Sequence, residues 1–175
     1  TVRHGRLGAV ALAAHPDRQS APPIFLNGTM EPVSLPLNER LDMTRALLQK
    51  AARLLQQADQ ARRSQHWGEA AEQTLQALKA ALRAFLIFHD VPLSEKAPLR
   101  RYWQCAVPLA SSLELFANRT ENLEELTAAL ADGHVPRVAE REAVLAAWYV
   151  ARNTLHTVLG ELPASVWSDQ TTNDR

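Results

Sequence analysis

The sequence predicts an all-α protein, an up-and-down bundle of four to five helices that follows an irregular N-terminal arm. From Asn38 onward the composition changes to Ala, Leu, Gln and Arg, which are good helix formers. Apolar residues then recur at steps of three and four, as they do on one face of a helix. No segment alternates apolar and polar residues between hairpin turns, as half-buried strands do. We therefore expect one helical bundle over residues 38–163.

Residues 1–37 are expected to form the irregular arm. This segment holds five of the ten prolines and sustains no apolar periodicity. Its run from Leu7 to Ala14 loosely resembles the apolar core of a secretory signal, but the run is short and contains Gly8. We favour an expression remnant, the tail of an upstream domain, or a start assigned too early, with Met30 as the natural beginning.

Proline and glycine divide the bundle into its helices. The expected helices cover residues 38–63, 68–89, a stretch from 98 onward, 120–131 and 138–162. Pro92 and Pro163 end the second and the last of these, because proline cannot continue a helix. Pro108 is expected to break or kink the third helix, and Gly133 is a natural C-terminal cap of the fourth. Residues 164–175 are expected to be a disordered tail.

The second helix, with the sequence EAAEQTLQALKAALRAFLIFHD over residues 69–90, is apolar on about half of its circumference. One stripe carries Leu and Phe, and the stripe beside it carries almost only small residues, among them Ala77, Ala81 and Ala84. Small side chains let a neighbouring backbone approach, whereas large ones fill a core. We therefore expect this helix to pack against two neighbours at once.

The overall composition excludes several classes of function. Lys plus Arg equals Asp plus Glu at 19 each, so no global charge favours nucleic acid or a membrane surface. The single Cys105 excludes an internal disulfide and favours a reducing compartment, and we expect a cytoplasmic protein. Neither a metal nor a cofactor is expected, because His66 and His134 lack metal-ligand spacing and no glycine-rich phosphate loop is present. His89 is interpreted as a helix-end histidine.

Two segments resemble helices of a known family. The segment GEAAEQTLQALKAALRAFLIFHDVPL (residues 68–93) is similar to the second helix of the HEPN superfamily, and AVLAAWYVARNTLHTVLGELP (residues 143–163) to its last helix. The resemblance covers about residues 39–163. It implies a bundle of four or five helices that commonly forms a homodimer. In some branches it implies metal-independent RNA cleavage, and in others a companion role to a nucleotidyltransferase, including toxin–antitoxin pairs.

A tetratricopeptide repeat is the competing resemblance. The segment QHWGEAAEQTLQALKAAL (residues 65–82) looks like the second helix of such a repeat. These repeats recur about every 34 residues and need about three copies to bury a core. The sequence holds no second copy, which argues against this interpretation.

Arg152 and His156 are the candidate catalytic residues. The nuclease branches of the superfamily carry an Arg, often followed by a polar residue, and then a His after four to six intervening residues. Here Asn153 takes the polar position, but only three residues intervene. The histidine could move a proton between a ribose hydroxyl and the leaving oxygen while the arginine binds the phosphate. The alternative is a polar pair at the edge of the apolar stripe, at an interface or a solvated boundary.

The segment EKAPLRRYWQ is the candidate nucleic-acid site. It combines cations with rings that can stack on bases, namely Lys96, Arg100, Arg101, Tyr102 and Trp103. The alternative is a helix start whose Tyr and Trp enter the core while the Arg side chains remain in water.

Three hypotheses on function remain open. The first is a HEPN-like binding module that dimerises or docks on a partner such as a nucleotidyltransferase or an antitoxin, without chemistry of its own. The second is a metal-independent HEPN ribonuclease that uses Arg152 and His156. The third is a helical adaptor with no link to nucleic acid.

Overall fold

The computed structural model describes residues 34–133 and 135–166, and within these ranges it is helical with no β-strand. The helices are α1 (Leu37–Arg63), α2 (Trp67–Phe88), α3 (Leu99–Ala106), α4 (Glu114–Ala117), α5 (Leu123–Ala131) and α6 (Val138–Glu161), with 3-10 turns η1 (Ser111–Leu113) and η2 (Ala164–Val166). The all-α expectation is therefore confirmed. The expected arm up to residue 33 and the tail beyond residue 166 lie outside the described residues.

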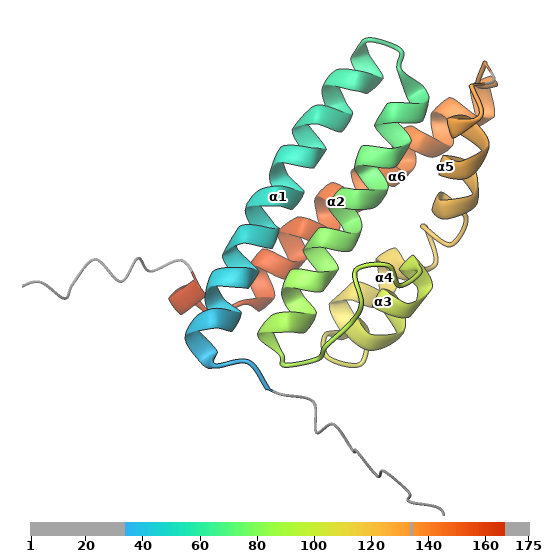
Figure 1. The fold of residues 1–175 in the computed structure, drawn as a ribbon. Helices are drawn as coiled ribbons and strands as arrows, with labels where there is room; N and C mark the ends of the chain where they lie inside the picture. Colours follow the sequence, from blue (N-terminus) through green and yellow to red (C-terminus); the bar gives the residue numbers. More distant parts are fainter. Residues whose placement is uncertain (1–33, 134, 167–175) are drawn as a thin grey trace, which may run out of the picture. The chain divides into compact units, whose positions relative to one another are not determined.

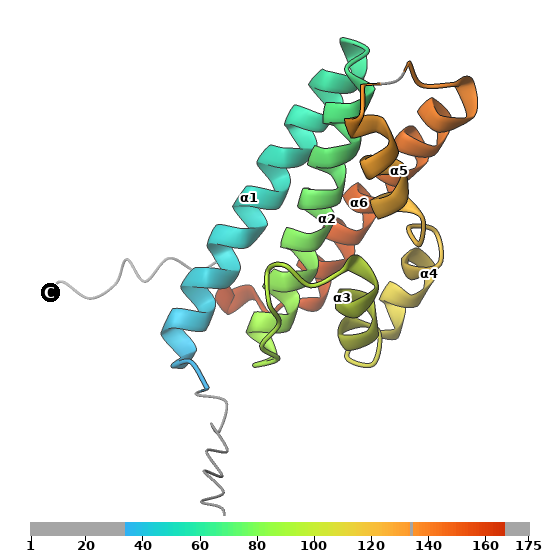
Figure 2. The ribbon, with the colours of Figure 1, turned by 45° about the vertical axis from the view of Figure 1, so that its right-hand side comes forward.

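Helices α1 and α2 form an antiparallel pair, seen side by side in Figures 1 and 2. The turn between them places Gln65 in the left-handed region, at φ 63°. At the far end, the guanidinium of Arg40 donates to the carbonyl of Phe88 at 3.2 Å. The buried hydroxyl of Thr44 also donates to the carbonyl of Ala84, at 3.3 Å. These two bonds tie the start of α1 to the end of α2.

Helix α2 is the centre of the bundle, and it contacts α1, α3, α5 and α6. Ala77, Ala81 and Ala84 are buried, as expected from the small-residue stripe. The polar edge of α2 also forms contacts. Lys79 pairs with Glu124 of α5 at 2.6 Å, and Arg83 pairs with Glu95 at 3.2 Å. Both sides of α2 are therefore covered, and its two cations attach it to elements that follow it in the chain.

Helices α3, α4 and α5 lie on the side of α2 that faces away from α1, as both ribbon views show. Helix α3 ends at Ala106, before Pro108, which agrees with the expected break. The short helix α4 was not expected, and α5 begins at Leu123 rather than at Thr120. Gly133 follows the C-terminal cap residue Asp132 of α5 and has a φ of 77°, which only glycine adopts without strain, so its role in ending the helix is confirmed.

Helix α6 runs behind α2 in Figure 1, from α5 to the start of α1. The carboxylate of Glu140 accepts a hydrogen bond from the backbone N–H of Arg137 at 2.7 Å, which satisfies one free donor at the start of the helix. At its other end the chain continues into η2, where Val166 is fully buried and Arg45 of α1 donates to the carbonyl of Ser165 at 3.3 Å. Residues 164–166 therefore belong to the bundle, which corrects the expected start of the tail.

Candidate functional site

Arg152 and His156 both lie on the exposed surface of α6, one helical turn apart. Trp148 precedes Arg152 by one further turn, so the three residues form one ridge along the helix. The guanidinium carbon of Arg152 lies 5.9 Å from the centroid of the Trp148 ring, within the range of a cation–π contact. The arginine of the expected pair therefore contacts an aromatic ring rather than the core.

A second arginine reaches the same ring from α1. The guanidinium carbon of Arg62 lies 5.5 Å from the Trp148 centroid. The indole N–H of Trp148 donates to the carbonyl of Leu55 at 3.1 Å, so the ring is held against α1. Tyr149 meets the ring edge-on, with centroids 5.1 Å apart, and is 49% exposed. We call the surface formed by Arg62, Trp148, Tyr149, Arg152 and His156 the Trp148 face.

The charge beside this face is positive. Asp59 of α1 accepts from Arg62 and lies 2.8 Å from the guanidinium of Arg63. The hydrogen bond from Arg62, supported by the charges of both arginines, holds the pKa of the Asp59 carboxyl below its ordinary value although partial burial opposes this. Asp59 thus pairs with two guanidinium groups, and Arg152 adds a third positive charge at the Trp148 ring. Within the described ranges no ion pair involves Arg152, so the excess positive charge remains.

In the candidate nucleic-acid segment, the cations and the aromatic rings lie on different sides of the chain. Lys96, Arg100 and Arg101 are exposed, but Tyr102 and Trp103 are 1% and 5% exposed. Both rings face the core because they share one side of α3 with the buried Leu99 and Ala106. The expectation that these rings stack on bases is therefore corrected, and the alternative of a helix start with buried rings applies.

Both buried rings keep their polar atoms paired. The Tyr102 hydroxyl donates to the carbonyl of Ser94 at 3.0 Å, and burial raises the pKa of this hydroxyl. The indole N–H of Trp103 donates to the hydroxyl of Thr120 at 2.9 Å. These bonds fasten α3 to the segments before and after it, which is a structural role.

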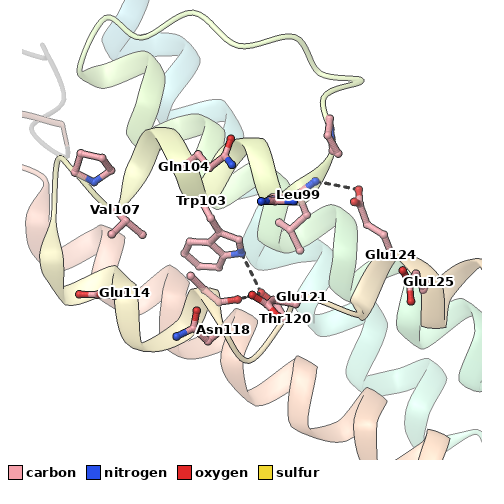
Figure 3. A pocket seen from close by; sticks show the side chains of 14 residues that line it. Leu99, Trp103, Gln104, Val107, Glu114, Asn118, Thr120, Glu121, Glu124 and Glu125 are labelled. Carbon is pink, nitrogen blue, oxygen red and sulfur yellow. Dashed lines mark hydrogen bonds between the residues drawn. The ribbon is translucent and has the colours of Figure 1, made fainter.

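A pocket of about 830 Å³ lies between α3 and the stretch from α4 to α5, and sequence reasoning missed it. Figure 3 shows the side chains that line it. Its carboxylates are Glu114, Glu121, Glu124 and Glu125. The segment LEEL (residues 123–126) contributes two of these. The glutamates between residues 114 and 125 were the sequence signal that could have indicated this pocket.

The other residues considered from sequence form no site. His89 ends α2 as expected, with its ring against Phe85 at a centroid distance of 4.5 Å. Cys105 is half-buried and carries a free thiol. In the part of the chain that the structure describes, no group of three or more His, Cys, Asp or Glu side chains could hold a metal ion. No helix there is long and apolar enough to cross a membrane.

Comparison of the chain with protein-family models, with curated proteins and with solved structures finds no match.

Proposed function

We propose that the chain is a HEPN-like binding module that docks on a partner protein through the Trp148 face, without chemistry of its own. The observation that carries the proposal is the pair of guanidinium groups, from α1 and α6, at 5.5 and 5.9 Å from one half-buried tryptophan ring. The resemblance to the HEPN superfamily supplies the partner class, which is a nucleotidyltransferase or an antitoxin-type protein.

The residue types of the Trp148 face are those that dominate binding energy at protein interfaces. Trp, Tyr and Arg are enriched among residues whose truncation costs most affinity. An exposed cation–π contact contributes only about 0.5–1 kcal/mol to folding, so stability gains little from it. A guanidinium group placed against a ring keeps its N–H donors in one plane, ready for a carboxylate. The half-exposed Tyr149 adds apolar area beside them.

The positive charge of the face favours an acidic partner over a second copy of the chain. A two-fold dimer places the same patch of both copies against each other. Such a dimer through the Trp148 face would bring Arg62 and Arg152 of each copy together, with Asp59 as the compensating carboxylate. Like charges across an interface cost affinity, whereas a carboxylate-bearing partner gains from them.

The candidate partner is the product of the adjacent gene, where that gene encodes a nucleotidyltransferase or an antitoxin. Full-length chain and candidate partner are co-expressed and purified, and their complex is measured by light scattering. We expect Arg62→Glu and Arg152→Glu each to weaken the complex at least tenfold, whereas Arg53→Glu, at an exposed position of α1, should not. If the chain remains a monomer and binds no such partner, docking is contradicted. If the chain forms a homodimer that Arg152→Glu abolishes, the occupant of the Trp148 face is a second copy of the chain.

Ribonuclease activity is the second candidate, and the exposure of both Arg152 and His156 on one ridge of α6 favours it. Both side chains can reach an RNA phosphate from solvent, as proton transfer and phosphate binding require. The test is incubation of the full chain with total RNA in a chelator, beside His156→Ala and the exposed control His66→Ala. Cleavage lost only in His156→Ala supports catalysis. Cleavage that survives in His156→Ala excludes His156, and no cleavage by the wild-type chain supports the binding module.

A further inference from the structure

The pocket between α3 and α5 has preformed walls. Its α3 wall is attached to the opposite wall by the hydrogen bond from Trp103 to Thr120, drawn in Figure 3. The carboxylate of Glu124 accepts from the backbone N–H of Leu99 at 3.0 Å, which ties α5 to the start of α3. Lys79 of α2 lies 2.6 Å from the same carboxylate oxygen. These three contacts fix the positions of the pocket walls, and walls of this preformed kind are usual for binding sites.

The rim of the pocket is negative. Glu124 is compensated by Lys79, but in the described ranges no ion pair involves Glu114, Glu121 or Glu125. Arg100 is the one cation among the described residues that line the pocket. Three uncompensated carboxylates therefore face one guanidinium group, and the local charge is opposite to that of the Trp148 face.

The floor and the surroundings of the pocket are apolar. Val107 and Ala117 are half-buried lining residues, and the lining residue Trp103 is more deeply buried. The same stretch of chain also exposes two large apolar side chains, since Leu109 is 42% exposed and Leu115 is 62% exposed. Leu109 and Leu115 directly follow the lining residues Pro108 and Glu114 in sequence, so exposed apolar side chains adjoin the charged rim.

We propose that this pocket binds a basic segment of a partner protein, one that carries two or more Lys or Arg side chains beside an apolar residue. The methylene stems of such side chains pack on an apolar floor while their charged ends stay at the rim. There they meet the carboxylates of Glu114, Glu121 and Glu125, so the charge of the occupant complements that of the pocket. The proposal is independent of the Trp148 face, which attracts the opposite charge.

The test measures binding of a fluorescently labelled amphipathic peptide of Leu and Lys to the full chain by anisotropy. The same peptide with Glu in place of Lys is the first control. We expect the Lys peptide to bind and the Glu peptide not to bind. The double variant Glu121→Lys/Glu125→Lys should lower the affinity for the Lys peptide at least tenfold. The double variant Glu72→Lys/Glu142→Lys, at exposed positions outside the pocket, changes the net charge equally and should retain affinity.

A second variant separates the pocket from general electrostatics. Gln104→Trp places a large side chain at an exposed position of the pocket wall without any change in charge, and it should also weaken the peptide at least tenfold. Circular dichroism confirms that each variant is folded. An equal loss of peptide affinity in the two double variants would overturn the proposal, as would an unchanged affinity in Gln104→Trp. Self-association of the wild-type chain that Glu121→Lys/Glu125→Lys abolishes would overturn it in favour of a second copy as occupant.

Discussion

The indole N–H of Trp103 donates a 2.9 Å hydrogen bond to the hydroxyl of Thr120, and both side chains are buried. The hydroxyl in turn lies 3.2 Å from the carbonyl of Ala117, to which it donates. One threonine thus joins α3 to the end of α4 and to the start of α5. Because Trp103 and Thr120 both line the pocket between α3 and α5, this bond also fixes the relative position of the two pocket walls.

Thr120→Val should destabilise the protein by about 1–3 kcal/mol, because a buried indole N–H would lose its acceptor. The free energy of unfolding is measured by urea denaturation. Thr127→Val is the matched control, since the hydroxyl of Thr127 is only partly buried and bonds within its own helix to Leu123. Equal losses in the two variants would show that the bond to Trp103 contributes nothing specific.

Gly68→Ala and Gly160→Ala should change stability in opposite directions. A Cβ at Gly68 would lie 3.0 Å from the carbonyl oxygen of Leu130, so α2 and α5 would have to separate. We expect a net loss of roughly 1 kcal/mol, in which overpacking outweighs the gain in helix propensity. A Cβ at Gly160 meets nothing within 4 Å, and alanine there should stabilise α6 by about 0.5–1 kcal/mol. Thermal unfolding of both variants measures the difference, and a melting temperature raised by Gly68→Ala would contradict it.

Ala81→Leu should destabilise the bundle by about 1–3 kcal/mol. Ala81 is fully buried on the central helix, and added methylene groups there force neighbouring helices apart. Ala52→Leu, at an exposed position of α1, makes the same chemical change and should stay within about 0.5 kcal/mol of the wild type. Chemical denaturation of the two variants decides whether the small-residue stripe is a packing requirement.

His89 should make the protein less stable as the pH falls below about 6.5. Partial desolvation lowers the pKa of His89 in the folded state, and the charge of Glu161 opposes this in part. The unfolded chain therefore binds the proton at a higher pH than the folded chain. The contribution of His89 is complete above the unfolded pKa and decreases as the pH falls through the folded pKa.

The comparison of wild type with His89→Gln measures this effect. The stability of the wild type relative to that of the variant should decrease between pH 7 and pH 5. His156→Gln removes a different histidine, on α6, and is the control for the substitution itself. A parallel pH dependence in the wild type and His89→Gln would rule out His89 as the source.

The long helices could be predicted from sequence because their signals are local. Apolar spacing, the prolines and Gly133 act over a few residues, and the observed bounds of α1, α2 and α6 agree with those expected within one residue at each end. The buried stripe with Ala77, Ala81 and Ala84 followed from the same periodicity. Helix α4 is a single turn and leaves no periodic pattern, so it could not be predicted in this way.

The candidate sites depended on tertiary structure, because they join side chains that are remote in sequence. Trp148 contacts α1 through a bond that spans 93 residues, and the bond from Leu99 to Glu124 that ties α5 to α3 spans 25. Composition alone placed Tyr102 and Trp103 beside cations, but the amphipathic face of α3 decided that both rings are buried. Sequence by itself determined the three long helices and their apolar faces. Packing decided which charged residues meet, because electrostatic contacts depend on distances in space that no local pattern encodes.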